Sequence, residues 1–256
     1  MARLPGIAGK FYRAGLLPEL VGGMISGKSG RDMVEDAKRL IGELEKETSI
    51  NIFGLENIPK ETGCVILFNH PNMDVLLPAM LGMMIGAYDT SGQKIMLVMG
   101  SEIPMTIKNF NEKSALPGSV WLLNRFHRLY SENIISVPTA ASRRDFLTGR
   151  TVAVRKIMRA IKNNNIVIIS PEGHVEKNGV ISPVETYHEG SGKLAILATR
   201  MGIPTVPVGI WETRNMTNVN IGRPFFLTAK EADLAAIEGM SEVAKMMPEV
   251  LRGPFY

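Results

Sequence analysis

Residues 63–81 read GCVILFNHPNMDVLLPAML, and this stretch indicates the fold class. Its residues 65–68 form a short, continuous apolar run, which is typical of a strand that is buried on both faces. A polar turn follows, and residues 73–88 then form an apolar stretch that is long enough for a buried helix. A strand that leads through a turn into a helix is the building unit of α/β folds.

The same alternation continues on both sides of this stretch. The apolar runs that we predict as strands are residues 50–53, 65–68, 95–98, 134–137, 166–169 and 206–210. Helical patterns lie at residues 31–47, 73–88, 119–130, 151–161 and 190–201. We therefore expect an α/β fold with a largely parallel central sheet flanked by helices, and an N-terminal helical appendage. In such folds the active groups gather where strands end and helices begin.

The N-terminal region differs from the rest in its charge pattern. We assign residues 1–48 to an N-terminal helical segment and residues 49–256 to the α/β domain. The first 31 residues carry five basic side chains and one acidic side chain among scattered apolar residues. This mixture is typical of a segment that lies on a membrane surface, and a helix folded back on the main domain accounts for it equally well.

Composition narrows the class of protein. The chain has 256 residues, a net charge of +4, 45% hydrophobic and 21% charged residues, which excludes a disordered or fibrous protein. The single cysteine, Cys64, excludes an internal disulfide and a cysteine-cluster metal site. No stretch reaches the roughly 18 to 20 apolar residues of a spanning helix, and no secretory signal pattern is present. We therefore expect a cytoplasmic protein that is peripheral on the inner face of the membrane.

The turn at residues 69–74 places a histidine and an aspartate after a predicted strand. A carboxylate can hold one nitrogen of an imidazole and fix its tautomer, so that the other nitrogen accepts a proton. His70 and Asp74 are therefore a candidate general base and its orienting group. Asp74 is also explained as a first-turn residue that the helix dipole favours, and Pro71 indicates that His70 precedes the helix.

Two further motifs follow the predicted strand at residues 166–169. The turn at residues 170–174, SPEGH, frames Glu172 with proline and glycine, which is typical of a ligand contact or of an ordinary turn with an exposed Glu172. Residues 188–193, HEGSGK, open the next helix, where backbone N–H groups and Lys193 could receive a phosphate or carboxylate. Plain helix capping explains the second motif equally well.

A basic stretch lies at residues 141–162, with seven basic side chains and one acidic side chain. Most of these side chains are explained as a solvated helix face. Arg143 and Arg144 differ because they lie between a predicted strand and that helix, where guanidinium groups can bind a phosphate with paired hydrogen bonds. Since no aromatic residues alternate with the charge, we do not expect nucleic acid as a partner.

Together these motifs resemble the glycerolphosphate and lysophospholipid acyltransferase family over residues 50–225. Residues 63–81 match the family's Asn-His…Asp block after a strand, and residues 166–198 match its Pro-Glu-Gly turn with a glycine-opened helix. The family's apolar strand with paired prolines is matched by residues 203–211, IPTVPVGIW. The arginine-bearing block is matched loosely around Arg143 and Arg144. The order of the blocks along the chain carries the resemblance.

The resemblance implies an O-acyltransferase of phospholipid biosynthesis. It would move a fatty acyl group from acyl-CoA or acyl carrier protein to the hydroxyl of a glycerol-phosphate or lysophospholipid acceptor. It implies His70 as the general base and Asp74 as its orienting group, with no cofactor, no metal and no acyl-enzyme intermediate. The residues expected to contact substrate are Asn69, Arg143, Arg144, Glu172, Gly173 and Lys193. The methionine-rich residues 75–88 and 95–105 are a candidate acyl groove, and core packing is the ordinary alternative.

Two other hypotheses stay open. Residues 22–29, GGMISGKS, satisfy the P-loop pattern and precede a helix, which predicts a nucleotide-binding protein if a strand leads into the loop. The third hypothesis is a non-catalytic lipid-binding relative. It comes from spacing, because the family places four residues between the histidine and the aspartate, whereas three residues separate His70 from Asp74.

Overall fold

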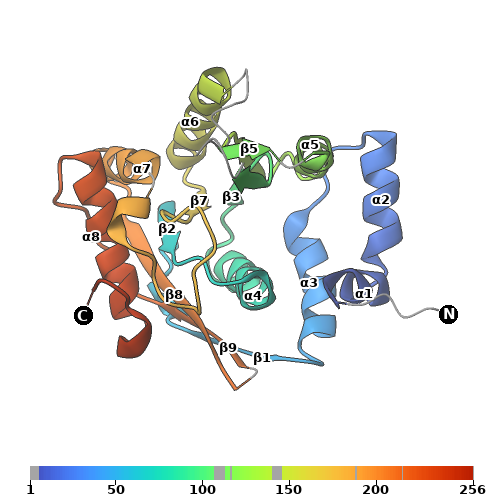
Figure 1. Cartoon of the computed structure of the whole chain (residues 1–256), viewed down its shortest axis with the longest axis horizontal. Helices are drawn as coiled ribbons and strands as arrows, with labels where there is room; N and C mark the ends of the chain where they lie inside the picture. Colours follow the sequence, from blue (N-terminus) through green and yellow to red (C-terminus); the bar gives the residue numbers. More distant parts are fainter. Residues whose placement is uncertain are drawn as a thin grey trace.

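The computed structural model describes residues 6–106, 113–115, 117–139, 146–187, 189–214 and 216–255. Its α-helices are α1 (Gly6–Arg13), α2 (Leu16–Ser26), α3 (Met33–Leu44), α4 (Met73–Ser91), α5 (Ser119–Leu129), α6 (Phe146–Lys162), α7 (Glu189–Arg200) and α8 (Ala232–Lys245). Short 3-10 helices lie at Leu55–Asn57, Val184–Thr186 and Glu249–Leu251. Figure 1 shows α1, α2 and α3 gathered on the side of the molecule opposite α8.

One sheet forms the centre of the fold. Its strands are β1 (Ser49–Phe53), β2 (Cys64–Phe68), β3 (Ile95–Gly100), β6 (Ile134–Val137), β7 (Ile166–Ile169), β8 (Thr205–Thr213) and β9 (Met216–Ile221), in the order β1-β9-β8-β2-β7-β3-β6. Strands β8, β2, β7, β3 and β6 run parallel, whereas β9 is antiparallel to β8 and parallel to β1. The predicted α/β fold with a largely parallel sheet is confirmed. Strands β4 (Pro104–Thr106) and β5 (Lys113–Ala115) form a separate antiparallel pair.

Strand β2 shows why both faces of the sheet are covered. All five of its residues are buried, and successive side chains of a strand point to opposite faces. Ile66 and Phe68 join a core cluster that contains residues of α3 and α4. Val65 and Leu67 join a second cluster that contains residues of α6, α7 and α8. A strand covered on both faces must be apolar throughout, which explains the continuous run in the sequence.

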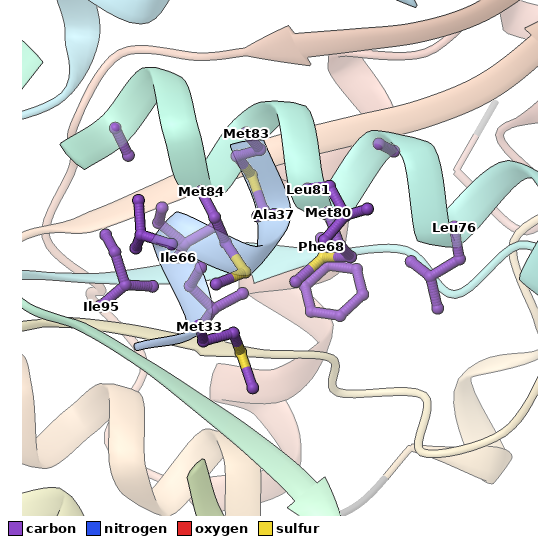
Figure 2. Packing of buried hydrophobic residues seen from close by; sticks show 14 of the residues in the cluster. Met33, Ala37, Ile66, Phe68, Leu76, Met80, Leu81, Met83, Met84 and Ile95 are labelled. Carbon is purple, nitrogen blue, oxygen red and sulfur yellow. The ribbon is translucent and has the colours of Figure 1, made fainter. Parts of the chain in front are cut away.

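Helix α4 leads directly out of the polar turn after β2. Asn72 is its N-cap, because the Asn72 side chain accepts hydrogen bonds from the backbone N–H groups of Asp74 and Val75. Met80, Met83 and Met84 of this helix are buried, and they pack with Met33 and other residues between α4 and the sheet (Figure 2). These three methionines are therefore core residues. Core packing was the ordinary alternative to an acyl groove for this segment.

The N-terminal helices pack on the α/β part of the chain. Leu16 and Leu20 of α2 belong to the same core cluster as α3 and α4, and the apolar face of α3 is buried in it. Lys10 and Arg13 pair with Glu47, and Arg31 pairs with Glu19 and Asp36. No helix among the residues that the structure describes combines the length and the apolarity needed to cross a bilayer.

The P-loop hypothesis for residues 22–29 is wrong. Helix α2 contains Gly22 and Gly23 and ends at Ser26, and its C-cap is Gly27, whose φ of 70° lies in the left-handed region. The segment is thus the C-terminal end of a helix, which exposes carbonyl groups, whereas a P-loop follows a strand and presents N–H groups to phosphate. A Cβ atom on Gly23 would lie 2.9 Å from Leu129 Cδ1. This glycine therefore allows α2 to approach α5 closely.

Candidate active site

His70 lies at the carboxyl end of β2, one of the central strands, before helix α4 begins. The imidazole is half-buried and stacks on Phe68, with 6.3 Å between the ring centroids. Its Nδ1 lies 3.3 Å from the carbonyl oxygen of Pro71. A carbonyl oxygen can only accept a hydrogen bond, so this contact holds the proton on Nδ1 and leaves the lone pair of Nε2 available.

The surroundings of His70 keep its ring neutral. Burial lowers the pKa of His70 below its ordinary value, and hydrogen bonds to its own backbone and to Pro71, together with the nearby Glu172 carboxylate, oppose this effect only in part. A neutral imidazole with a free Nε2 can accept a proton at physiological pH. The placement therefore suits a general base.

Asp74 is exposed in the first turn of α4. Within the described part of the chain, no hydrogen bond joins the Asp74 carboxylate to the His70 ring. The pairing of these two side chains stays a prediction. That His70 precedes the helix, as Pro71 indicated, is confirmed by the start of α4 at Met73.

Asn69 extends the sheet beyond the end of β2. Its side-chain amide donates to the carbonyl oxygen of Ile210 at 2.8 Å, and its side-chain oxygen accepts from the Ile210 N–H at 2.7 Å. These two bonds have the same donor and acceptor pattern as a backbone pair between Asn69 and β8. The Asn69 side chain is fully buried. The remaining N–H of the Asn69 amide donates to Glu176 at 3.2 Å. A substrate contact for Asn69 stays a prediction.

Glu172 ties the turn after β7 to the turn after β2. Its Oε2 accepts from the backbone N–H of His70 at 2.7 Å, and its Oε1 accepts from the backbone N–H of Ser182 at 2.8 Å. Glu172 is fully buried, so the alternative of an exposed turn residue is wrong. Both carboxylate oxygens serve the protein backbone, which makes Glu172 a link between loops. Its predicted substrate role stays a prediction.

The rest of this turn is shaped by Gly173 and Glu176. Gly173 has a φ of 63°, a left-handed conformation that side chains with a Cβ rarely adopt, and it is exposed next to the buried Glu172. The backbone N–H of Glu176 donates to the carbonyl oxygen of His70 at 2.8 Å. The backbone of His70 is therefore held at its N–H by Glu172 and at its carbonyl by Glu176.

The Acyltransferase family model matches residues 49–211, well over half of the chain. The chain belongs to the acyltransferase family. Among solved structures it is similar to the 1-acyl-sn-glycerophosphate (LPA) acyltransferase PlsC from Thermotoga maritima, at 17% sequence identity and a TM-score of 0.47, with 90% of each chain covered. No curated protein matches it significantly. Family membership rests on the family model alone.

The other predicted contact residues of this acyltransferase have different outcomes. Arg143 and Arg144 lie outside the residues that the structure describes. Lys193 is exposed in α7, one residue after Gly192, which packs against the start of α8. A role for these three cations in binding phosphate stays a prediction.

Sequence reasoning missed Glu176 as a member of the site. Glu176 follows Glu172 in an irregular turn, where no helical or strand period connects their side chains. Its side chain is 6% exposed and accepts a hydrogen bond from Asn69, which lies 107 positions earlier in the chain. The only signal in the sequence was a second acidic residue beside the Pro-Glu-Gly turn.

Proposed function

We propose that this acyltransferase moves a fatty acyl group from acyl-CoA or acyl carrier protein to the hydroxyl of a glycerol-phosphate or lysophospholipid acceptor, a reaction of phospholipid biosynthesis. The observation that carries the proposal is the position of His70 at the carboxyl end of a central strand, where ligands bind in open α/β sheets. Its lowered pKa and its accessible Nε2 suit proton abstraction from a hydroxyl.

The proposed reaction is a direct transfer. The acceptor oxygen attacks the thioester carbonyl carbon while its proton passes to Nε2 of His70. The tetrahedral intermediate then expels the thiolate as the C–S bond breaks, and the thiolate takes the proton from the imidazolium. Rotation of the His70 ring away from the Pro71 carbonyl would let the Asp74 carboxylate stabilise the imidazolium, because Asp74 lies in the first turn of the next helix.

The acceptor would be held by the predicted contact residues around this histidine. In the proposal, Arg143 or Arg144 neutralises the acceptor phosphate, with Lys193 as the next candidate. Gly173 offers exposed backbone beside the site, and Glu172 and Asn69 act on the acceptor through the loops that they hold together.

A thiol-release assay across a panel of acyl donors and acceptors tests this function. We expect His70→Ala to lower turnover by about 10²- to 10⁴-fold, since a general base contributes that much. Asp74→Asn should also be slow. His174→Ala is the matched control, because it removes an imidazole from the neighbouring turn after β7 without removing the proposed base. Thiol release by folded His70→Ala at the wild-type rate would refute the mechanism, and lipid binding without any thiol release would favour a non-catalytic relative.

We also propose that the protein acts on the inner face of the cytoplasmic membrane, attached through its N-terminal helices. Ile25 of α2 is 71% exposed, and Val21, one turn earlier, is exposed on the same side of the helix. Lys28 follows at the end of this helix and is exposed. Apolar side chains beside a basic group fit a lipid surface. The ion pairs of Lys10, Arg13 and Arg31 reduce the charge that this segment offers to anionic headgroups.

Vesicle co-sedimentation tests the attachment with the full chain, because α2 shares the hydrophobic core. We expect Ile25→Asp to lower binding to anionic vesicles, and high salt to release the wild-type protein. Val250→Asp is the matched control, because Val250 is 73% exposed near the other end of the chain. Equal loss of binding by both variants would contradict attachment through α2.

A further inference from the structure

Two buried glutamates contact the backbone of His70. Glu172 is 0% exposed and Glu176 is 6% exposed, and the Glu172 carboxylate is close enough to act on the pKa of Glu176. A hydrogen bond between two carboxyl groups needs one proton, because two carboxylates can only accept. Both oxygens of Glu172 already accept from backbone N–H groups, whereas Oε1 of Glu176 is buried without a hydrogen-bond partner. The missing proton therefore belongs on Oε1 of Glu176.

In the described part of the chain, no positive charge near this pair would stabilise two ionised carboxylates. Across the ranges that the structure describes, no lysine or arginine forms an ion pair with Glu172 or Glu176. The titratable groups near the pair are His70, His174 and Tyr187, and burial lowers the pKa of His70 and raises the pKa of Tyr187, so that both of these favour their neutral forms. Burial and the adjacent Glu172 carboxylate both raise the pKa of Glu176 well above its usual range.

We propose that Glu176 is a positioning residue that stays protonated and donates a hydrogen bond to the Glu172 carboxylate, and so holds the backbone of His70. The pair contacts both sides of the His70 peptide, because Glu172 accepts from its N–H and the Glu176 N–H donates to its carbonyl. Asn69 joins Glu176 to β8 through Ile210. The inference rests on the proposed function only in naming His70 as the base.

Loss of the proton would act on His70 directly. A second negative charge beside Glu172 would repel it, and Glu172 could not move without stretching its bonds to the His70 and Ser182 N–H groups. We therefore expect an alkaline limb in the pH profile of kcat that belongs to Glu176. We expect misplacement of the base to lower kcat more than it raises KM, because the proposed phosphate contacts of Arg143, Arg144 and Lys193 lie on other segments.

Isosteric substitutions separate the two carboxyl groups. Glu176→Ala should lower kcat about tenfold to a hundredfold, and Glu176→Gln should restore most of it, since its amide N–H can donate to Glu172 while its oxygen accepts from Asn69. Glu176→Gln should also lack the alkaline limb. Glu172→Gln should have a low kcat, unlike Glu176→Gln, because its amide NH₂ group would face a backbone N–H that needs an acceptor. Equal damage by Glu176→Gln and Glu172→Gln, or an unchanged alkaline limb in Glu176→Gln, would overturn the proposal.

A measurement without substrate keeps this inference separate from the proposed function. A carboxyl that is protonated in the fold and ionised in the unfolded chain loses stabilising effect as pH rises from the unfolded pKa through the folded pKa. Wild-type Tm should thus fall from pH 5 to pH 8 more steeply than that of Glu176→Gln. The infrared band of a buried protonated carboxyl should disappear in Glu176→Gln and remain in the exposed control Glu185→Gln. A wild-type spectrum without this band would refute the shared proton, whatever the acyl-transfer assay gives.

Discussion

The two faces of the central sheet are packed by different means. On one face, α4 packs against both the sheet and α3, and buried methionines of α3 and α4 belong to the shared core (Figure 2). On the other face, α7 and α8 approach so closely that a Cβ atom on Gly192 would lie 1.7 Å from the carbonyl oxygen of Ala232. Flexible side chains can absorb a change in volume, whereas backbone atoms in contact cannot. The second face should therefore tolerate a much smaller increase in side-chain volume than the first.

Adding one methyl group to each face should give the largest difference in the free energy of unfolding. Gly192→Ala places a Cβ against the backbone of α8, and we expect it to lower the free energy of unfolding by about 3 kcal/mol or more. Gly82→Ala in α4 meets the Cδ1 atom of Ile52 at 2.9 Å, the mobile end of a side chain, and we expect a change of about 1 kcal/mol or less. Urea unfolding of both variants measures the difference.

Gly190→Ala is the matched control for this comparison. It lies in the same helix as Gly192, and a Cβ there would meet no atom within 4 Å. Alanine favours the helix by about 1 kcal/mol over glycine, so this variant should be neutral or slightly more stable. If Gly192→Ala were as stable as Gly190→Ala, the close contact between α7 and α8 would not exist in solution.

The difference between the faces also explains what the sequence predicted of the fold. The predicted strands at 134–137 and 166–169 coincide with β6 and β7, because buried parallel strands are continuous apolar runs. Strand β9 and helix α8 were not predicted. Residues 216–221, MTNVNI, mix asparagine with apolar residues in an antiparallel strand. Helix α8 is rich in alanine, which suits close packing but gives only a weak apolar pattern.

Removing the buried carboxylate of Asp36, on the first face, should have the next largest effect on the free energy of unfolding. Asp36 of α3 is 8% exposed and accepts hydrogen bonds from Arg31 and from the Tyr130 hydroxyl at 2.7 Å. Asp36→Ala leaves both partners without this carboxylate, and Tyr130 is 3% exposed. We expect a loss of about 3 kcal/mol in the free energy of unfolding, as for a buried pair that loses one member. Thermal and urea unfolding check this.

Glu35→Ala controls for the loss of a carboxylate from the same helix. The Glu35 side chain is 67% exposed and pairs with Lys38 at 3.4 Å. We expect a change below about 1 kcal/mol, because an exposed pair contributes little. A comparable loss in the Asp36 and Glu35 variants would show that charge on α3, and not burial, stabilises this face.

The candidate site could be located from the sequence but not built from it. The turn at residues 69–74 and the turn at 170–174 both follow predicted parallel strands, so their placement at the same edge of the sheet was predictable. That β2 and β7 are neighbours came from the structure. The link between them was not predictable, because it depends on Glu172 and Glu176 turning inward to bind backbone N–H groups and Asn69. The residue type of a glutamate does not reveal whether its side chain is buried.

The smallest effect should come from the surface of the first face. Glu47 pairs with Lys10 at 3.0 Å and with Arg13 at 2.7 Å, and its side chain is 50% exposed. Hydrogen bonding to Lys10 lowers the pKa of Glu47, but solvent screens a pair at this exposure. We expect Glu47→Gln to change Tm by about 2 °C or less in low salt and to match wild type in 1 M salt. Scanning calorimetry at both salt concentrations makes the comparison. A shift that persists in high salt would mean that α1 is held to the molecule by this carboxylate, and not by the apolar core.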